Sequence, residues 1–193
     1  FNEKLGFGAA DDSTIDMKVA DMDGDGDLDL ILANRDAQQN YIYLNDGNLN
    51  FDQKIAFGSG EDHTRSIAII DMNADEYLDI VTANINGPNV IYFGNSTLRY
   101  EHKSVFDVQL DKSYAIALGD LDGDKDVDIV IANHGEPNTY FINQSQGILW
   151  KKYALSNEAY HTYDIVLSDL NEDGRLDIIE SNSDERNLYY FNQ

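Results

Sequence analysis

Apolar and polar positions alternate in blocks along the chain, and the same order of blocks recurs four times. Each block begins with a short apolar stretch, passes through an acidic loop, and continues into a Val/Ile/Leu-rich run that ends in Asn. Apolar runs of this length between turn residues predict strands that are buried on both faces. These interior strands are predicted at residues 28–34, 78–84, 127–133 and 176–182.

Two further strands are predicted after each interior strand. A turn rich in Gly, Pro, Asp or Gln leads to an aromatic segment, at residues 40–45, 89–94, 138–143 and 187–192. A more polar segment follows at residues 51–57, 100–106 and 150–154, and the Asn-Asp-Gly turn at residues 45–47 is a strong hairpin signal. Each unit therefore reads as a four-stranded antiparallel meander.

The period of the pattern predicts the fold. The acidic loops begin at residues 21, 71, 120 and 169, and units of this length recurring in one chain indicate a propeller. The fourth unit ends after its third strand, whereas residues 1–8 align without gaps on residues 51–58. We therefore predict one all-β domain over residues 1–193, a four-bladed β-propeller of four-stranded antiparallel blades whose N-terminal strand closes the last blade. The expected repeats span about residues 9–58, 59–106, 107–154, and 155–193 together with 1–8.

Other ways of closing the ring are compatible with this pattern. A four-bladed ring is a monomer, whereas an eight-bladed ring needs two chains, and the repeats also suit part of a larger ring. The chain begins at Phe1 without an initiator Met, which favours a processed protein or an excised domain.

The acidic loops have the ligand pattern of a hard cation. Ca²⁺ takes roughly six to eight oxygen ligands, and a tight loop with carboxylates at alternate positions can supply them from side chains and the carbonyl of its seventh residue. The twelfth loop positions hold no bidentate Glu followed by a helix, which excludes an EF-hand. Asn replaces one carboxylate in the second and fourth loops, and sodium or water could fill the second. We predict up to four Ca²⁺, bound by Asp21, Asp23, Asp25, Asp27, Asp29, Asp71, Asn73, Asp75, Tyr77, Asp79, Asp120, Asp122, Asp124, Asp126, Asp128, Asp169, Asn171, Asp173, Arg175 and Asp177.

Composition narrows the possible partners. A net charge of −23 argues against nucleic acid or an anionic membrane as a partner, because both would be repelled, and a hydrophobic content of 42% argues against a disordered acidic chain. The chain has no Cys, so it forms neither disulfides nor thiolate metal sites, and it shows no transmembrane span or signal peptide. Together with the calcium loops, these features suggest an extracellular or secreted protein.

The loops opposite the acidic ones form the candidate recognition face. The entries to the first strands align hydroxyl residues at positions 14, 64, 113 and 162, and imidazole, aromatic and basic residues lie beside them. Such groups at a concave mouth suit a sugar or a peptide. They are equally compatible with hydroxyls that satisfy the loop backbone and aromatics that pack between blades. The candidate ligand-binding residues are His63, Arg65, Lys112, Tyr114, His134, His161 and Tyr163.

The unit as a whole resembles a known repeat family. The Asp-x-Asp/Asn-x-Asp-x-x-x-Asp loop between apolar strands, together with Phe7-Gly8 and Phe57-Gly58, resembles the FG-GAP or VCBS repeats of integrin α-chains, propeller lectins and bacterial adhesins. The resemblance implies a calcium-binding, lectin-like or adhesion module without catalytic residues or an organic cofactor, whose partner is a glycan or an extracellular protein. Two alternatives stay open: a polysaccharide lyase that uses Tyr160 and His161, and a structural spacer in a large secreted protein.

Overall fold

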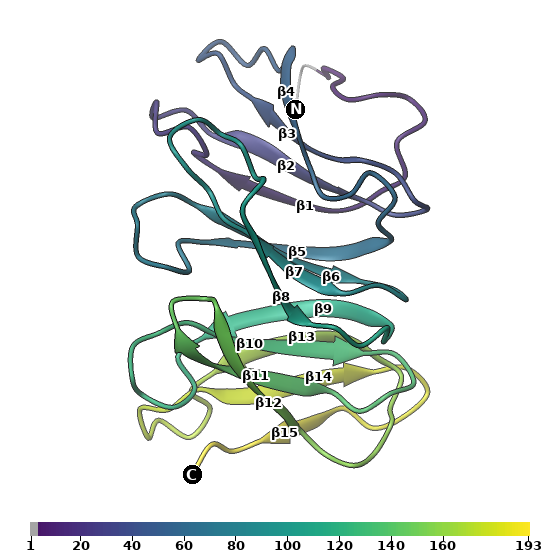
Figure 1. The fold of residues 1–193 in the computed structure, drawn as a ribbon. Coiled ribbons are helices and arrows are strands. Elements are labelled where there is room, and N and C mark those ends of the chain that lie inside the picture. The colour runs from purple at the N-terminus through teal and green to yellow at the C-terminus, as the bar shows by residue number, and fades with distance from the viewer. Residues whose placement is uncertain (1–3) are drawn as a thin grey trace.

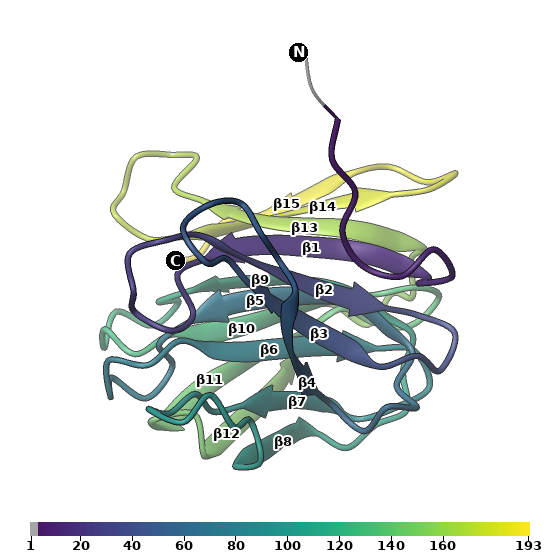
Figure 2. The same cartoon turned by 90° about the horizontal axis from the view of Figure 1, so that it is seen from above.

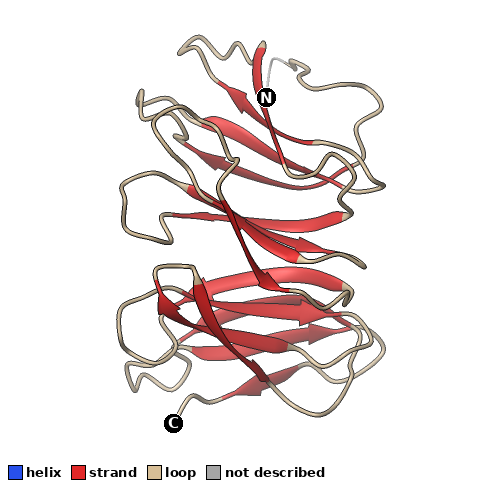
Figure 3. Cartoon of the chain, viewed as in Figure 1, coloured by secondary structure: helices blue, strands red, loops and turns tan. Residues whose placement is uncertain are grey.

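The computed structural model describes residues 4–193, which form fifteen strands and no helix (Figure 3). The first sheet contains β1 (Thr14–Ala20), β2 (Asp29–Asn34), β3 (Asn40–Leu44) and β4 (Gln53–Phe57). The second contains β5 (Thr64–Ile70), β6 (Asp79–Asn84), β7 (Asn89–Tyr92) and β8 (Lys103–Asp107). The third contains β9 (Ser113–Gly119), β10 (Asp128–Asn133), β11 (Thr139–Ser145) and β12 (Leu149–Ala154). The fourth contains β13 (Thr162–Ser168), β14 (Asp177–Asn182) and β15 (Leu188–Tyr190).

Each sheet is an antiparallel meander in which consecutive strands pair. In the first sheet Thr14 pairs with Asn34 and Ala20 with Asp29, which places the start of β1 and the end of β2 at the same end of the sheet. The acidic loop between β1 and β2 therefore lies at the opposite end. The prediction of an all-β fold built from antiparallel meanders is confirmed, with four strands in three sheets and three in the last.

The hydrophobic core lies between the sheets. At the first junction, Ile31 and Ile42 of the first sheet pack with Ile67 and Ile80 of the second, and all four are almost completely buried. Equivalent clusters join the second sheet to the third and the third to the fourth. Because β6 and β10 have a neighbouring sheet on each side, every residue in them is buried, as their continuous apolar sequences predict.

The four sheets follow one another in chain order, with the first and the fourth sheet at the two ends of the series (Figure 1). The inner strands pack in sequence, β1 on β5, β5 on β9 and β9 on β13, and no comparable contact joins β13 to β1 among the described residues. Figure 2 shows the same sheets from above, with the N-terminal segment leading away from β1. In the described part of the chain no helix is long and apolar enough to cross a membrane.

The predicted N-terminal strand does not complete the last sheet. Residues 4–8 belong to no strand, and residues 1–3 of the predicted strand lie outside the described residues. The Phe7 ring instead contacts the rings of Tyr43 and Phe51, with centroids 5.9 and 6.0 Å apart. The physical reason is distance: the first and last sheets lie at opposite ends of the series, so the N-terminal segment packs on the sheet beside it.

Candidate functional site

The first Asp of each acidic loop folds the loop around its own carboxylate. Asp21 accepts hydrogen bonds from the backbone N–H groups of Gly24 (2.8 Å) and Gly26 (2.9 Å). The fourth and sixth residues of all four loops have positive φ, including the non-glycine residues Ala74, Glu76, Lys125 and Glu172. The four loops therefore share one backbone conformation, although Gly occupies both positions only in the first.

The last Asp of each loop is a buried anchor. Asp128 accepts hydrogen bonds from the N–H groups of Leu121 (2.7 Å) and Asn143 (2.8 Å), so it ties the loop to the last part of β11. Desolvation by burial raises the pKa of Asp128 to about 6, although the two N–H donors oppose the shift. Asp79 is held in the same way, and burial also raises its pKa to about 6.

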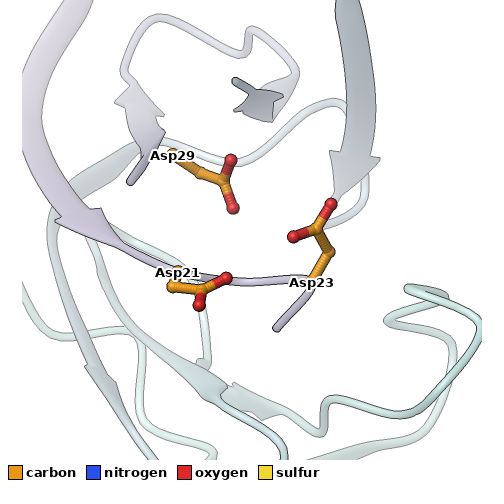
Figure 4. Close-up of side chains that lie close together, drawn as sticks. All are labelled: Asp21, Asp23 and Asp29. Carbon is orange, nitrogen blue, oxygen red and sulfur yellow. The ribbon is translucent and has the colours of Figure 1, made fainter. Parts of the chain in front are cut away.

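In each of two loops, three carboxylates lie close enough together that one cation could bind to all three. Oxygens of Asp21, Asp23 and Asp29 all lie within 4.8 Å of one another, and Figure 4 shows the three side chains converging from the loop and the start of β2. Burial raises the pKa of Asp23, and repulsion from Asp25 and Asp21 adds to the rise. A divalent cation would relieve this repulsion, and the oxygen-only donor set fits Ca²⁺. In the third loop the group is Asp120, Asp122 and Asp124, so the fifth loop residue takes the place of the ninth.

The other members of the predicted ligand set have different contacts. The side chain of Asp25 accepts the N–H of Asp27 at 2.9 Å, and the equivalent bond joins Asp124 to Asp126 at 2.8 Å. These bonds position the seventh loop residue, whose carbonyl was the predicted ligand. In the second loop, the Asn73 amide donates to Asp75 at 3.0 Å, and the N–H of Tyr77 bonds the other oxygen of Asp75 at 2.9 Å.

The fourth loop contains a cation of its own. The guanidinium of Arg175 donates to the Asp173 carboxylate at 2.7 Å and to the carbonyl of Asn192 at 3.0 Å. The Asn171 amide also donates to Asp173, at 3.0 Å. Hydrogen bonding from the Arg175 backbone, supported by the Asn171 amide and the Arg175 charge, lowers the pKa of Asp173. The sequence predicted that Arg175 contributes only its backbone carbonyl as a metal ligand. In the structure its side chain instead bonds to the Asp173 carboxylate, which a metal would need. Asp169 and Asp177, the first and last residues of this loop, accept backbone N–H bonds as their counterparts in the other loops do. In the second loop, Asp71 accepts N–H bonds as Asp21 does in the first.

At the other end of the sheets, five of the seven predicted ligand-binding residues form an aromatic and histidine cluster. The Tyr114 ring stacks on His134 (centroids 4.9 Å apart) and meets Tyr163 edge-on at 5.2 Å. His134 also contacts His161 at 4.7 Å and Tyr163 at 5.2 Å. The Arg65 guanidinium lies 4.3 Å from the Tyr114 ring centroid, within range of a cation–π interaction. The cluster thus joins three neighbouring sheets, and Tyr163 is 48% exposed.

The remaining two predicted residues lie outside this cluster. His63 contributes its backbone carbonyl to the N–H of Ile85 and has an exposed side chain. Lys112 is also exposed, and its N–H donates to Glu136 at 2.9 Å. The equivalent Glu185 accepts the N–H of His161 at 3.0 Å, with its other oxygen 3.7 Å from the imidazole Nδ1. Sequence reasoning missed both acids, although they align at the same position of the turns before β11 and β15.

Three of the four aligned hydroxyls connect neighbouring sheets. Each buried hydroxyl accepts a hydrogen bond from an Asn amide of the preceding sheet at 2.9 Å: Asn40 to Thr64, Asn89 to Ser113, and Asn138 to Thr162. Ser113 and Thr162 also donate to an Asn on the second strand of their own sheet. These hydroxyls therefore have a structural role, but their partners are Asn side chains and not the loop backbone groups that the sequence suggested.

Comparison with known proteins agrees with the repeats and with the fold. A family model described as FG-GAP-like repeat matches residues 21–82, 71–131 and 120–180. No curated protein sequence matches the chain. Among solved structures, it is similar to two crystal structures of BBS1N in complex with ARL6DN, soaked with mercury (TM-score 0.62, 15% identity) and with lead (TM-score 0.61, 16% identity).

The two likenesses cover 92% of this chain but 54% of the matched chain, so this chain spans about half the length of those structures. At such low identity these similarities show only the fold, which is a propeller type of arrangement. Three overlapping matches to the family model cover most of the sequence, and they confirm the resemblance first read from the acidic loops. The chain belongs to the FG-GAP-like repeat family.

Proposed function

We propose that this chain is a calcium-stabilised extracellular recognition module that binds a protein partner through its aromatic and histidine cluster. The observation that carries the proposal is that Arg65, Tyr114, His134, His161 and Tyr163 converge from three sheets at one exposed place. Tyr and Arg side chains are enriched among the residues that dominate the energetics of protein interfaces, and Tyr buries a large surface with little loss of conformational entropy. The solved neighbour BBS1N is itself in complex with another protein, ARL6DN.

Calcium has a structural role in this proposal. The carboxylate groups of the first and third loops supply the two best sites, while internal amide and guanidinium donors compete for the acids of the second and fourth. An ion at the loop end fixes the turn between the first two strands of its sheet. It would act far from the cluster, because the register places the loops and the cluster at opposite ends of the strands.

The proposal is binding without catalysis. The rings of His134 and His161 pack against each other, and that of His134 also packs against Tyr163, so both imidazoles are restrained as parts of a surface.

A glycan is the second candidate ligand. The exposed ring of Tyr163 offers a flat apolar face on which a sugar could stack, and Glu185 beside His161 offers a hydrogen-bond acceptor. A peptide display library and a glycan array, both screened in calcium, separate the two classes of ligand.

The cluster is tested with the double variant Tyr114→Ala/Tyr163→Ala. We expect ligands selected on the native protein to bind this variant at least tenfold more weakly. The matched control is His102→Ala, because His102 stacks on Phe93 with centroids 4.8 Å apart, outside the cluster. Ligands that bind the cluster variant as tightly as the native protein would place recognition elsewhere, provided that thermal melting shows the variant to be folded.

A further inference from the structure

A groove lies between β4 and β8, the outer strands of the first and second sheets. Its volume is about 410 Å³, which is in the range of sites that hold small ligands. Both sheets have four strands and are neighbours in the series, so described residues bound the groove on both sides. Its lining combines buried aromatic rings with exposed charged side chains, namely Phe57, Tyr92, Tyr100, Arg99, Glu101 and Lys103.

The hydroxyl of Tyr92 is an unused hydrogen-bond donor in this groove. Tyr92 is 4% exposed, and its ring packs on Phe57 with centroids 6.0 Å apart. Within residues 4–193 its hydroxyl has no hydrogen-bond partner, whereas that of the neighbouring Tyr100 reaches the carbonyl of Leu78 at 3.5 Å. Buried polar groups are normally paired. Burial raises the pKa of Tyr92, and the charge of Asp62 adds to the rise, so the hydroxyl keeps its proton and can donate it.

The equivalent place between the second and third sheets holds a lysine that is neutralised by an acid. The ammonium of Lys152 on β12 donates to both carboxylate oxygens of Asp107, at 2.9 and 3.0 Å, and also to the side chain of Gln109. It lies 5.3 Å from the ring centroid of Phe141. The end of the preceding outer strand thus supplies the carboxylate that holds this cation against the aromatic ring.

The first groove has the lysine but lacks the acid. Lys103 on β8 corresponds to Lys152, because each pairs with the aromatic residue of the neighbouring strand that lines its junction. Gly58 corresponds to Asp107, since each follows the last Phe of the preceding outer strand. In the described part of the chain, neither Lys103 nor Arg99 beside it forms an ion pair, in contrast to Lys152. Two cations therefore share a groove from which the matching carboxylate is missing.

The two nearest acids do not take the place of that carboxylate. Asp62 accepts the N–H and the hydroxyl of Ser59, both at 2.7 Å, so its oxygens are held by its own loop. Glu101 is exposed and forms no ion pair within the described ranges. The lining of the groove therefore carries two positive charges and one negative charge, although the whole chain has a net charge of −23.

We propose that this groove binds a small aromatic carboxylate. The ring of the ligand packs against Tyr92 and Phe57, and its carboxylate takes the place that Asp107 has at the next junction. Lys103 and Arg99 neutralise that carboxylate, and the free hydroxyl of Tyr92 supplies a further donor. The groove shares no residue with the aromatic and histidine cluster, so this proposal does not rest on the proposed function.

The charge preference of the groove is tested with phenylacetate and phenethylamine, which have the same ring and opposite charges. Isothermal titration calorimetry in Ca²⁺ at physiological ionic strength should show saturable binding of one phenylacetate per chain. Phenethylamine should bind about tenfold more weakly, because it lacks charge-assisted hydrogen bonds to the two cations. General attraction to the acidic chain would favour the amine, so a preference for the acid identifies the groove.

Two variants that preserve the shape of the groove locate the ligand. Lys103→Met removes the charge and keeps the apolar stem, and it should weaken phenylacetate binding about tenfold; Tyr92→Phe removes only the hydroxyl and should weaken it about fivefold. The matched control is Lys54→Met, because Lys54 has the equivalent position on β4 but lies over the ring of Tyr41, 4.0 Å from its centroid, outside the groove. No saturable binding of phenylacetate, equal binding of phenethylamine, or unchanged affinity in a folded Lys103→Met variant would each overturn the proposal.

Discussion

Adding Ca²⁺ to the metal-free protein is expected to raise its melting temperature by about 10–20 °C. The expected stabilisation follows from two candidate sites, in the first and third loops, whose carboxylates come together only in the folded state. At a free Ca²⁺ concentration one hundred times the dissociation constant, each site contributes about 2.7 kcal/mol, or about 5 kcal/mol for both. For a chain of this size, each kcal/mol shifts the midpoint by about 2–4 °C.

The experiment compares melting curves, recorded by circular dichroism or calorimetry, in EDTA, in Ca²⁺ and in Mg²⁺ at equal ionic strength. The Mg²⁺ arm controls for general screening of the −23 net charge. Asp23→Ala removes a carboxylate of the first loop and should halve the calcium-dependent gain, whereas Asp52→Ala, an exposed acid outside the loops, should leave it intact. Equal midpoints in Ca²⁺ and Mg²⁺, or a full gain in Asp23→Ala, would refute the assignment of the loops.

Three substitutions test the local arguments. Lys125→Gly should raise the free energy of unfolding by about 1 kcal/mol in urea titrations because Lys125 has a φ of 78°, whereas Lys151→Gly in the middle of β12 should lower it. Arg175→Ala should add one Ca²⁺ to the stoichiometry measured by isothermal titration calorimetry, because it frees the Asp173 carboxylate. The control Lys151→Ala should leave the stoichiometry unchanged. An unchanged stoichiometry in Arg175→Ala would contradict competition between Arg175 and Ca²⁺ for Asp173. Asn138→Ala should cost about 2–4 kcal/mol because it removes buried bonds to Thr162, Glu180 and the N–H of Asn133, while the exposed Asn48→Ala should change the unfolding free energy by less than about 0.5 kcal/mol.

The strands and the acidic loops could be predicted because their determinants are local and repeated. The apolar run Val127–Asn133 predicts a buried strand, and the alternating acids of Asp120–Asp128 predict a cation-binding loop. Neither prediction needs information from distant parts of the chain. The loops keep one conformation even at Glu76 and Lys125, because the carboxylate of the first Asp accepts the N–H group of each. The predicted site positions therefore fall on equivalent parts of each loop.

Two of the three errors concern contacts that join segments far apart in the sequence. The sequence of residues 1–8 identifies an outer strand but contains no signal for which sheet it joins, since that depends on how far the series of sheets turns. Thr64 and Ser113 appear as free hydroxyls in the sequence because their Asn donors lie on the preceding sheet. The side chain of Arg175 reaches back to Asp173 by rotamer choice, and the loop pattern does not encode it.

Among the described residues, the strong contacts of each sheet are with its neighbours in the series, so the molecule resembles a one-dimensional array. In such an array the free energy of unfolding is a sum of terms for each unit and each junction, and the unit with the weakest sum opens first. The fourth sheet has three strands and one described junction, whereas the inner sheets have four strands and two. Local opening should therefore begin at β13–β15 and pass inward, which leaves the second and third sheets as the last to exchange their amide protons with solvent.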